Sequence, residues 1–250
     1  MPDNLHISVE GRVATVALAR GKVNALNESL VDELAACLEQ LEADPAVDAL
    51  ILTGQGKFFS FGFDIPAFMD TPRDDFTRYL EKFTALYARL FLFPKPVIAA
   101  LNGHTMAGGC MLASACDWRV MVEGRAKIAL NEIGFGSTVL AGAVEMLVYG
   151  VGARTAQDIL YNGSLYTPDE ALALGLIDQV CSPEELVPTA QAKATELGAK
   201  DTAAFASIKN LLRAPVAARM AEREPASIAA FVDLWYADST REQLAKITIN

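Results

Sequence analysis

The chain has 250 residues, 52% of them hydrophobic, which is enough to fill the core of one large domain or of a domain with an appendage. Its formal net charge of −10 disfavours nucleic acid as a partner. No apolar run approaches the ~18 residues of a membrane-spanning helix, which argues against a membrane protein. The four cysteines form no CxxC pair and there are only two histidines, so we expect no metal site but reduced, buried thiols at Cys37, Cys110, Cys116 and Cys181.

The first fifty residues predict a hairpin, a helix and a strand in that order. Residues 5–18 alternate apolar and polar side chains around a turn at Glu10-Gly11, as a hairpin does. Asn27 can cap a helix in which leucines recur at helical spacing until Asp44-Pro45 ends it. The apolar run at residues 49–53 then predicts a buried strand.

The middle of the chain continues this alternation, and the last part is helical. An amphipathic helix is expected over residues 74–91, stopped by Pro94 and Pro96. The runs 97–101 and 117–122 are apolar enough for strands buried on both faces. Alternating strands and helices indicate an α/β fold with a parallel sheet. After Pro183 the sequence predicts helices only, over residues 184–197, 202–212 and 225–247.

Two glycine-bearing stretches, residues 58–65 (FFSFGFDI) and 102–111 (NGHTMAGGCM), each follow one of these strands. Glycine lets the backbone approach a ligand closely, and the second stretch is expected to open a helix whose first N–H groups have no internal partner. Two such loops side by side could direct two backbone amides at one oxygen atom. The pattern therefore predicts an oxyanion hole made of backbone alone.

These two stretches resemble the glycine-rich signatures of the crotonase (enoyl-CoA hydratase/isomerase) superfamily. The resemblance extends over roughly residues 10–185 and includes, in the same order, the stretches KVNAL at 22–26, CDWR at 116–119 and LNE at 130–132. It implies a crotonase-like spiral of ββα units over residues 1–195 and a C-terminal all-helical region over 196–250. The latter is expected to cover the site and to hold a homotrimer or a dimer of trimers together, through the apolar residues after Pro225.

The resemblance also implies an acyl-CoA substrate and names the residues that would hold it. The backbone amides of Phe63 and Gly108 would form the oxyanion hole, and CoA would arrive as part of the substrate, with no other cofactor. Local cations such as Arg20, Lys22 and Lys57 would have to offset the negative net charge when the polyanionic CoA binds. The residues expected to bind the CoA part are Lys22, Asn24, Ala25, Phe61, Asp64 and Ile65.

Only one of the two glutamates of enoyl-CoA hydratases has a counterpart in this sequence. Met111 stands where the first would be, three residues after Gly108, and methionine cannot exchange a proton. Glu132 stands at the second position. One carboxylate is enough to move a proton between two carbons, and the pattern is similar to that of Δ3,Δ2-enoyl-CoA isomerases. Glu132 could instead simply begin a helix, but its apolar neighbours favour a general base with a raised pKa.

The predicted function is isomerisation of a 3-enoyl-CoA to a 2-enoyl-CoA thioester, with Glu132 as acid and base. The alternatives are an enoyl-CoA hydratase, a CoA-thioester hydrolase, and a catalytically silent acyl-CoA-binding paralogue. His104 lies before the second loop, and we expect a structural role for it. The chain begins without a signal-peptide pattern and ends in Thr248-Ile249-Asn250, which is not a peroxisomal signal, so a cytoplasmic location is expected.

Overall fold

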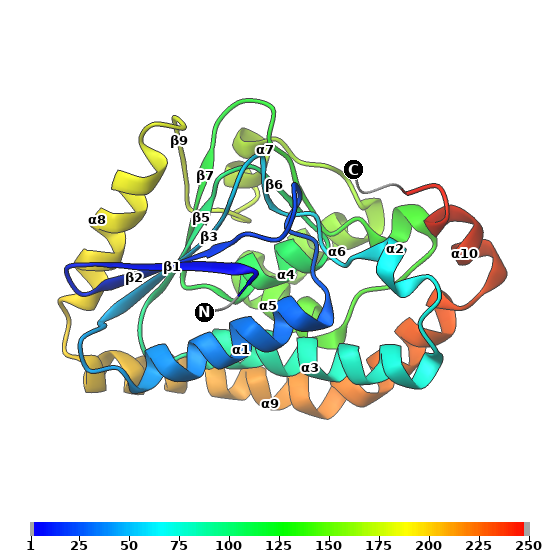
Figure 1. Ribbon diagram of the computed structural model, residues 1–250, viewed down its shortest axis with the longest axis horizontal. Coiled ribbons are helices and arrows are strands. Elements are labelled where there is room, and N and C mark those ends of the chain that lie inside the picture. Colours follow the sequence, from blue (N-terminus) through cyan, green and yellow to red (C-terminus); the bar gives the residue numbers. More distant parts are fainter. Residues whose placement is uncertain (1–2, 248–250) are drawn as a thin grey trace.

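The computed structural model describes residues 3–247, which form two parallel-rich sheets surrounded by helices (Figure 1). In the six-stranded sheet β1 and β2 are antiparallel, as the predicted hairpin requires, and every other neighbouring pair is parallel. Its strands are, in spatial order, β1 (Leu5–Glu10), β2 (Val13–Leu18), β3 (Ala49–Gly54), β5 (Val97–Leu101), β7 (Trp118–Val122) and β9 (Gln179–Cys181).

A second, three-stranded parallel sheet runs beside the first and contains β4 (Phe58–Ser60), β6 (His104–Met106) and β8 (Ile128–Ala129). Strand β4 follows β3 closely along the chain, β6 follows β5, and β8 follows β7. The first strands of these pairs, β3, β5 and β7, are neighbours in the large sheet, and the second strands, β4, β6 and β8, are neighbours in the same order in the small sheet. This repeated turn confirms the spiral of ββα units. It also places the loops after β4 and β6 next to each other.

The helices cover this spiral on several sides. Helices α1, α3 and α9 lie together along one side of the molecule, and α8 packs on the large sheet (Figure 1). The helices are α1 (Glu28–Ala43), α2 (Ile65–Phe68), α3 (Arg73–Leu92), α4 (Gly108–Ala115), α5 (Ala141–Val151), α6 (Ala153–Asn162), α7 (Pro168–Ala173), α8 (Leu186–Gly198), α9 (Thr202–Trp235) and α10 (Asp238–Leu244), with a 3₁₀ helix η1 (Glu132–Phe135). No helix within residues 3–247 is both long and apolar enough to cross a membrane.

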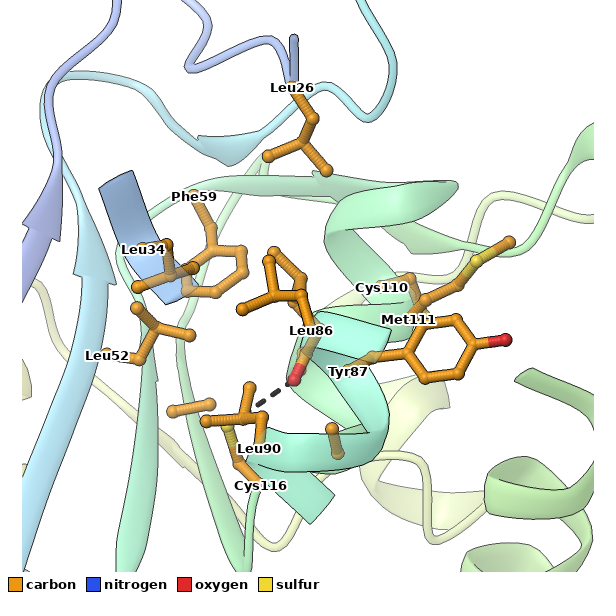
Figure 2. Packing of buried hydrophobic residues seen from close by; sticks show 14 of the residues in the cluster. Leu26, Leu34, Leu52, Phe59, Leu86, Tyr87, Leu90, Cys110, Met111 and Cys116 are labelled. Atoms are coloured by element: carbon orange, nitrogen blue, oxygen red, sulfur yellow. Dashed lines mark hydrogen bonds between the residues drawn. The ribbon is translucent and has the colours of Figure 1, made fainter. Parts of the chain in front are cut away.

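The expected helix signals act as predicted. The Asn27 side chain accepts a hydrogen bond from the Leu30 N–H at 3.0 Å and so caps α1. Figure 2 shows how Leu34 of α1, Leu52 of β3 and Leu86 of α3 meet in the core between these elements. Strand β5 is buried along its whole length. The four cysteines are free and buried, which confirms the prediction of reduced thiols.

The prediction of two separate helices over 202–212 and 225–247 is wrong. A single helix, α9, runs from Thr202 to Trp235 through Pro215 and Pro225, and α10 follows it. A proline inside a helix removes one backbone hydrogen bond, which normally ends or bends the helix. Here both prolines lie on the exposed face, so water can reach the freed carbonyls. The other face packs against α3 and α5 and keeps the helix continuous. The boundary proposed between residues 195 and 196 falls inside α8 and stays a prediction.

Candidate active site

The first glycine-rich loop lies directly against the start of α4. Gly62 has a φ of +95°, and a Cβ atom there would come within 3.2 Å of the Gly108 nitrogen and 3.0 Å of the Met106 carbonyl oxygen. Only glycine fits such a contact with this backbone conformation. In the same way, a Cβ on Gly109 would come within 2.8 Å of the Ser60 carbonyl oxygen. The glycines of the two signatures are therefore needed for the close approach of one loop to the other.

Buried hydrogen bonds hold the first loop in place. The Ser60 hydroxyl donates to the Asn24 carbonyl at 2.7 Å and accepts from the Gly62 N–H at 3.1 Å. Asn24 itself has a φ of +50°, and its side-chain amide donates to the Phe58 carbonyl at 2.9 Å and to the Gln55 carbonyl at 3.1 Å. Asn24 is completely buried. The described contacts of its side chain are thus internal ones that fix the loop.

Two backbone amides in this region have no acceptor among residues 3–247. Leu26 pairs with the loop through two hydrogen bonds: its N–H donates to the Gly62 carbonyl, and its carbonyl accepts from the Asp64 N–H. The N–H of Phe63, which lies between these two residues, has no acceptor among the described residues. Gly108 is the first residue of α4, so its N–H has no acceptor within the helix. The preceding Ala107 has a φ of +46°, an unusual value for alanine. Two free N–H donors thus come from two touching loops.

Glu132 begins η1 and is buried, with only 3% of its surface exposed. Neither carboxylate oxygen has a hydrogen-bond partner among the described residues. Burial raises the pKa of Glu132 from its ordinary value of 4.5 to about 8, because the charged form loses its hydration. A carboxylate that merely stabilised a helix start would keep a low pKa. The environment of Glu132 therefore suits a proton acceptor near neutral pH.

An apolar cavity of about 180 Å³ joins Glu132 to the two loops. It brings together five of the residues predicted from sequence, namely Phe61, Phe63, Ile65, Gly108 and Glu132. The remaining lining residues are Met106, Ala107, Asn131, Phe135, Leu165, Phe231, Trp235 and Ile247. Glu132 is the one titratable side chain among the described residues of this lining.

The other predicted CoA-binding residues do not line the cavity. Asp64 caps α2 and forms an ion pair with Arg20 at 2.6 Å, and Arg20 also donates to the Ala25 carbonyl at 2.9 Å. The Arg20 side chain therefore already has an ion-pair partner and a hydrogen-bond acceptor within the protein. Lys22 and Lys57 are exposed. The two segments that carry these lysines lie near each other, since a Cβ on Gly56, the residue before Lys57, would lie 3.9 Å from the Lys22 carbonyl oxygen.

The family model for "Enoyl-CoA hydratase/isomerase" matches residues 8–246, nearly the whole chain. The chain belongs to the enoyl-CoA hydratase/isomerase family. Its fold is the crotonase fold, as the likeness to a solved structure shows. The human mitochondrial Δ3,Δ2-enoyl-CoA isomerase has a TM-score of 0.93 to it at 28% identity, with 97% of this chain and 96% of the other covered.

The proteins similar to this chain in sequence include both hydratases and isomerases. A crotonyl-CoA hydratase of Syntrophomonas wolfei is 37% identical over 192 residues, which are 74% of this chain and 72% of the relative. The human mitochondrial enoyl-CoA delta isomerase 1 is 30% identical over 234 residues, which are 93% of this chain and 78% of the relative. Family membership therefore supports an enzyme acting on enoyl-CoA, and the choice between hydration and isomerisation depends on the site.

In this family member, position 111 offers no second acid. Met111 is in the hydrophobic core on α4, beside Cys110, and 1% of its surface is exposed (Figure 2). It is not among the residues that line the cavity. His104 does not line the cavity either, and its ring packs against Phe58 with the centroids 5.0 Å apart.

The C-terminal helical region was expected to cover the site, but the sequence did not identify which of its residues line the cavity. The apolar residues after Pro225 were expected to lie partly between subunits, which stays a prediction. Of these residues, Ile228, Phe231, Val232 and Trp235 are buried within the chain, and Leu234 is 41% exposed. Phe231 lies 6.0 Å from the Phe63 ring, and Phe231 and Trp235 both line the cavity. Their spacing of four residues places them on one helix face, which is the signal that predicted burial. It did not say which surface they would cover.

Proposed function

We propose that this enzyme is an isomerase that shifts the double bond of a 3-enoyl-CoA thioester from C3–C4 to C2–C3. The observation that carries the proposal is a single, buried carboxylate, unpartnered among the described residues, in a cavity also lined by Phe63 and Gly108, whose backbone amides have no acceptor among those residues. A double-bond shift needs one group that removes a proton and returns it two carbons away. A hydratase uses two carboxylates to position and activate water, and position 111 is methionine.

The Glu132 carboxylate would remove a proton from C2 of the bound substrate. The electrons of the broken C–H bond then form a C1–C2 double bond while the π electrons of the thioester carbonyl move to its oxygen, which gives a dienolate with double bonds at C1–C2 and C3–C4. The same carboxyl group returns the proton to C4: the C3–C4 π electrons form the new C4–H bond, the C1–C2 π electrons become the C2–C3 double bond, and the carbonyl forms again. No atom is gained or lost. A positioned base of this kind contributes roughly 10²–10⁴-fold to the rate.

The amides of Phe63 and Gly108 would stabilise the dienolate oxygen. Both are fixed by the contact between the two loops before any substrate arrives, so little reorganisation is needed when the charge develops. Loss of one such donor typically costs ~2.7–4 kcal/mol in the transition state. The bulk of Phe63, where the family usually has alanine, does not affect this role because the donor is its backbone N–H.

The CoA part would bind outside the cavity, over the loops that contain Lys22, Ala25 and Asp64. We propose the exposed Lys22 and Lys57 as partners for its phosphates, since Arg20 is already paired with Asp64. Asn24 would act by holding the loop rather than by touching CoA. Within residues 3–247 no cluster of His, Cys, Asp and Glu side chains has the arrangement of a metal site.

We also propose that the chain assembles as a homotrimer, alone or as a dimer of trimers. Support comes from large apolar side chains that are exposed beside the cavity. Ile133 of η1 and Leu165 are each 51% exposed, and Tyr161 of α6 is 72% exposed. Light scattering on the purified protein tests this, and a monomer would contradict it.

Product analysis tests the proposed reaction. The purified enzyme is incubated separately with a 3-enoyl-CoA and with the corresponding 2-enoyl-CoA, and the products are separated by chromatography and mass. We expect interconversion of the two positional isomers, with no gain of 18 mass units. A hydrated product would indicate a hydratase, free CoA thiol would indicate a hydrolase, and binding without turnover would indicate a silent paralogue.

A further inference from the structure

The end of the cavity contributed by α9 carries a second unpartnered polar group, the indole of Trp235. Only 1% of its surface is exposed. Its ring packs against Phe76, with the centroids 4.7 Å apart, and against Phe231 at 6.1 Å. Trp235 also lines the cavity. The indole is therefore held firmly by aromatic neighbours while part of it borders the space where the acyl chain of the substrate would lie.

The indole nitrogen Nε1 of Trp235 has no hydrogen-bond partner among the described residues. A buried tryptophan N–H usually finds an acceptor, because leaving it unpaired is unfavourable. Glu132 and Trp235 are the two residues of the described cavity lining whose buried side-chain polar atoms are unpartnered. The role of Glu132 is explained by proton transfer. The Trp235 N–H, a donor only, needs a different explanation.

The reaction itself offers no acceptor for this N–H. The thioester oxygen is taken by the Phe63 and Gly108 amides, and the carbons from C2 to C4 carry no polar atom. We propose that the preferred acyl chain carries an uncharged oxygen, as a hydroxyl, ether or keto group, beyond C4, and that Trp235 Nε1–H donates a hydrogen bond to it. This inference rests on the proposed acyl-CoA function and assigns Trp235 as a determinant of substrate specificity.

The acceptor has to be uncharged because of the rest of the cavity wall. No lysine, arginine or histidine lies among its described lining residues. A carboxylate at the end of the acyl chain would therefore be buried without a counter-charge and near Glu132, which is strongly unfavourable. An uncharged oxygen requires only one donor, and the Trp235 Nε1–H can supply it.

Binding measurements with saturated thioesters test the proposal without requiring turnover. The probes are hexanoyl-CoA, its 5-hydroxy, 6-hydroxy and 5-oxo derivatives, and adipoyl-CoA, whose chain ends in a carboxylate. We expect at least one of the three uncharged oxygenated probes to bind about tenfold more tightly than hexanoyl-CoA, the upper range for one hydrogen bond. Adipoyl-CoA should bind more weakly than all of them. Tighter binding of adipoyl-CoA would overturn the requirement for an uncharged oxygen.

Two matched variants identify the donor. Trp235→Phe keeps an aromatic ring and removes the N–H, so the preference for the oxygenated probe, measured as the ratio of its Kd to that of hexanoyl-CoA in the same variant, should disappear. The chain has one other tryptophan, Trp118, which does not line the cavity and lies under the Lys193 ammonium at 5.7 Å. Trp118→Phe should retain the full preference. If Trp235→Phe retains it as well, or weakens all probes equally, the proposal is wrong.

The Trp118→Phe variant also allows a direct observation, because Trp235 is then the only tryptophan. The nitrogen-15 and proton resonances of its indole N–H are recorded as each probe is added. A downfield proton shift with the oxygenated probe, larger than that with hexanoyl-CoA, would show the hydrogen bond with Trp235 itself unchanged. Equal shifts with both probes would contradict the proposal. Because none of these probes can isomerise, the result is independent of whether the proposed reaction is correct.

Discussion

Two buried glutamates in this molecule have opposite surroundings. Glu132 lies in the cavity, and neither of its oxygens has a partner among the described residues. Glu224 lies where α9 meets α3 and α5, and its carboxylate accepts hydrogen bonds from the Tyr87 hydroxyl at 2.6 Å, the Gly142 N–H at 2.9 Å and the Ser227 hydroxyl at 2.8 Å. Their exposed fractions are similar, 3% and 8%. Burial alone therefore does not distinguish a catalytic acid from a structural one.

The two glutamates differ in the hydrogen-bond donors that surround their carboxyl groups. Glu224 is supplied with three donors, one of them at the start of α5, and so it connects three helices in one defined arrangement. Glu132 receives no such donor within the described chain, which leaves its lone pairs available to a substrate proton. A carboxylate without partners costs stability, and sites of catalysis are where such a cost is tolerated. The comparison can be tested with matched glutamine variants.

The largest effect is expected for Glu132→Gln on turnover. Glutamine has nearly the same shape and cannot accept the proton, so kcat for 3-enoyl-CoA isomerisation should fall by roughly 10²–10⁴-fold. The Kd for acyl-CoA should stay within a few fold of the parent, since the oxyanion amides remain. Glu224→Gln, measured in the same assay, should retain most of the activity. Turnover of Glu132→Gln within tenfold of the parent would remove Glu132 from the role of base.

The same two variants should shift stability in opposite directions. The unfolded chain releases the Glu132 proton near pH 4.5, whereas the folded chain holds it up to about pH 8. Between these values the folded state binds more protons, so this group makes the parent less stable as pH rises, by an amount on the order of a few kcal/mol. Glu132→Gln lacks this loss and should be more stable than the parent at pH 9.

Glu224→Gln should instead lower the free energy of unfolding, by about 1–3 kcal/mol, because the glutamine NH₂ group cannot accept a hydrogen bond and the three donors around residue 224 are no longer all satisfied. Chemical denaturation at pH 6 and pH 9 measures both effects. The advantage of Glu132→Gln over the parent should be larger at pH 9 than at pH 6. An advantage that is independent of pH would mean that Glu132 is not the group that binds the extra proton.

A smaller effect is expected in the pH dependence of the parent enzyme. Glu132 must be ionised to accept the C2 proton, and burial raises its pKa to about 8. The value of kcat/KM should therefore increase by about tenfold between pH 7 and a plateau above pH 8, as the ionised fraction grows. Initial rates in buffers of constant ionic strength measure this. A profile that is flat from pH 6 to pH 9 would show that the free enzyme already holds Glu132 ionised.

The parts of the site that sequence predicted depend on short, local patterns. The two glycine-rich loops, the strands before them and Glu132 each lie within a few residues of a recognisable signature, and the chain path between neighbouring turns of the spiral brings them together. The order of the main strands and helices up to residue 122 could be predicted for the same reason, since caps, prolines and hydrophobic periodicity act locally. The short strands of the second sheet and the helices between residues 141 and 173 were not predicted.

The parts that sequence could not place depend on contacts between distant segments. Phe231 and Trp235 gave the periodicity of a buried helix face, but that signal is the same whether the face covers a cavity, a core or another subunit. Asn24 was assigned to CoA because of its neighbours in the signature. Its positive φ and its hydrogen bonds to residues more than thirty positions away arise only in the folded loop. The sequence around residue 24 therefore does not predict them.

The smallest expected effect concerns hydration in the variant Met111→Glu. Methionine and glutamate are similar in length and both favour helix, so α4 should persist. Residue 111 lies one turn after Gly108, but its side chain is packed in the core and not in the cavity wall. The new carboxyl group would be buried near a second acid, so we expect lower stability, a raised pKa for at least one of the two acids and weakened isomerisation.

Hydration of 2-enoyl-CoA by Met111→Glu should then reach only a trace level, detected as the hydroxyacyl product by mass. The water pocket of a hydratase requires space between two carboxylates, and a single substitution does not create it. Met111→Gln, which has the same shape without the charge, serves as the control and should give no hydrated product. The comparison depends on the parent being a poor hydratase. If the parent hydrates 2-enoyl-CoA at a rate that rivals its isomerisation, water activation does not require an acid at position 111. Glu132 would then serve both chemistries, and the absence of a second glutamate would no longer separate an isomerase from a hydratase in this protein.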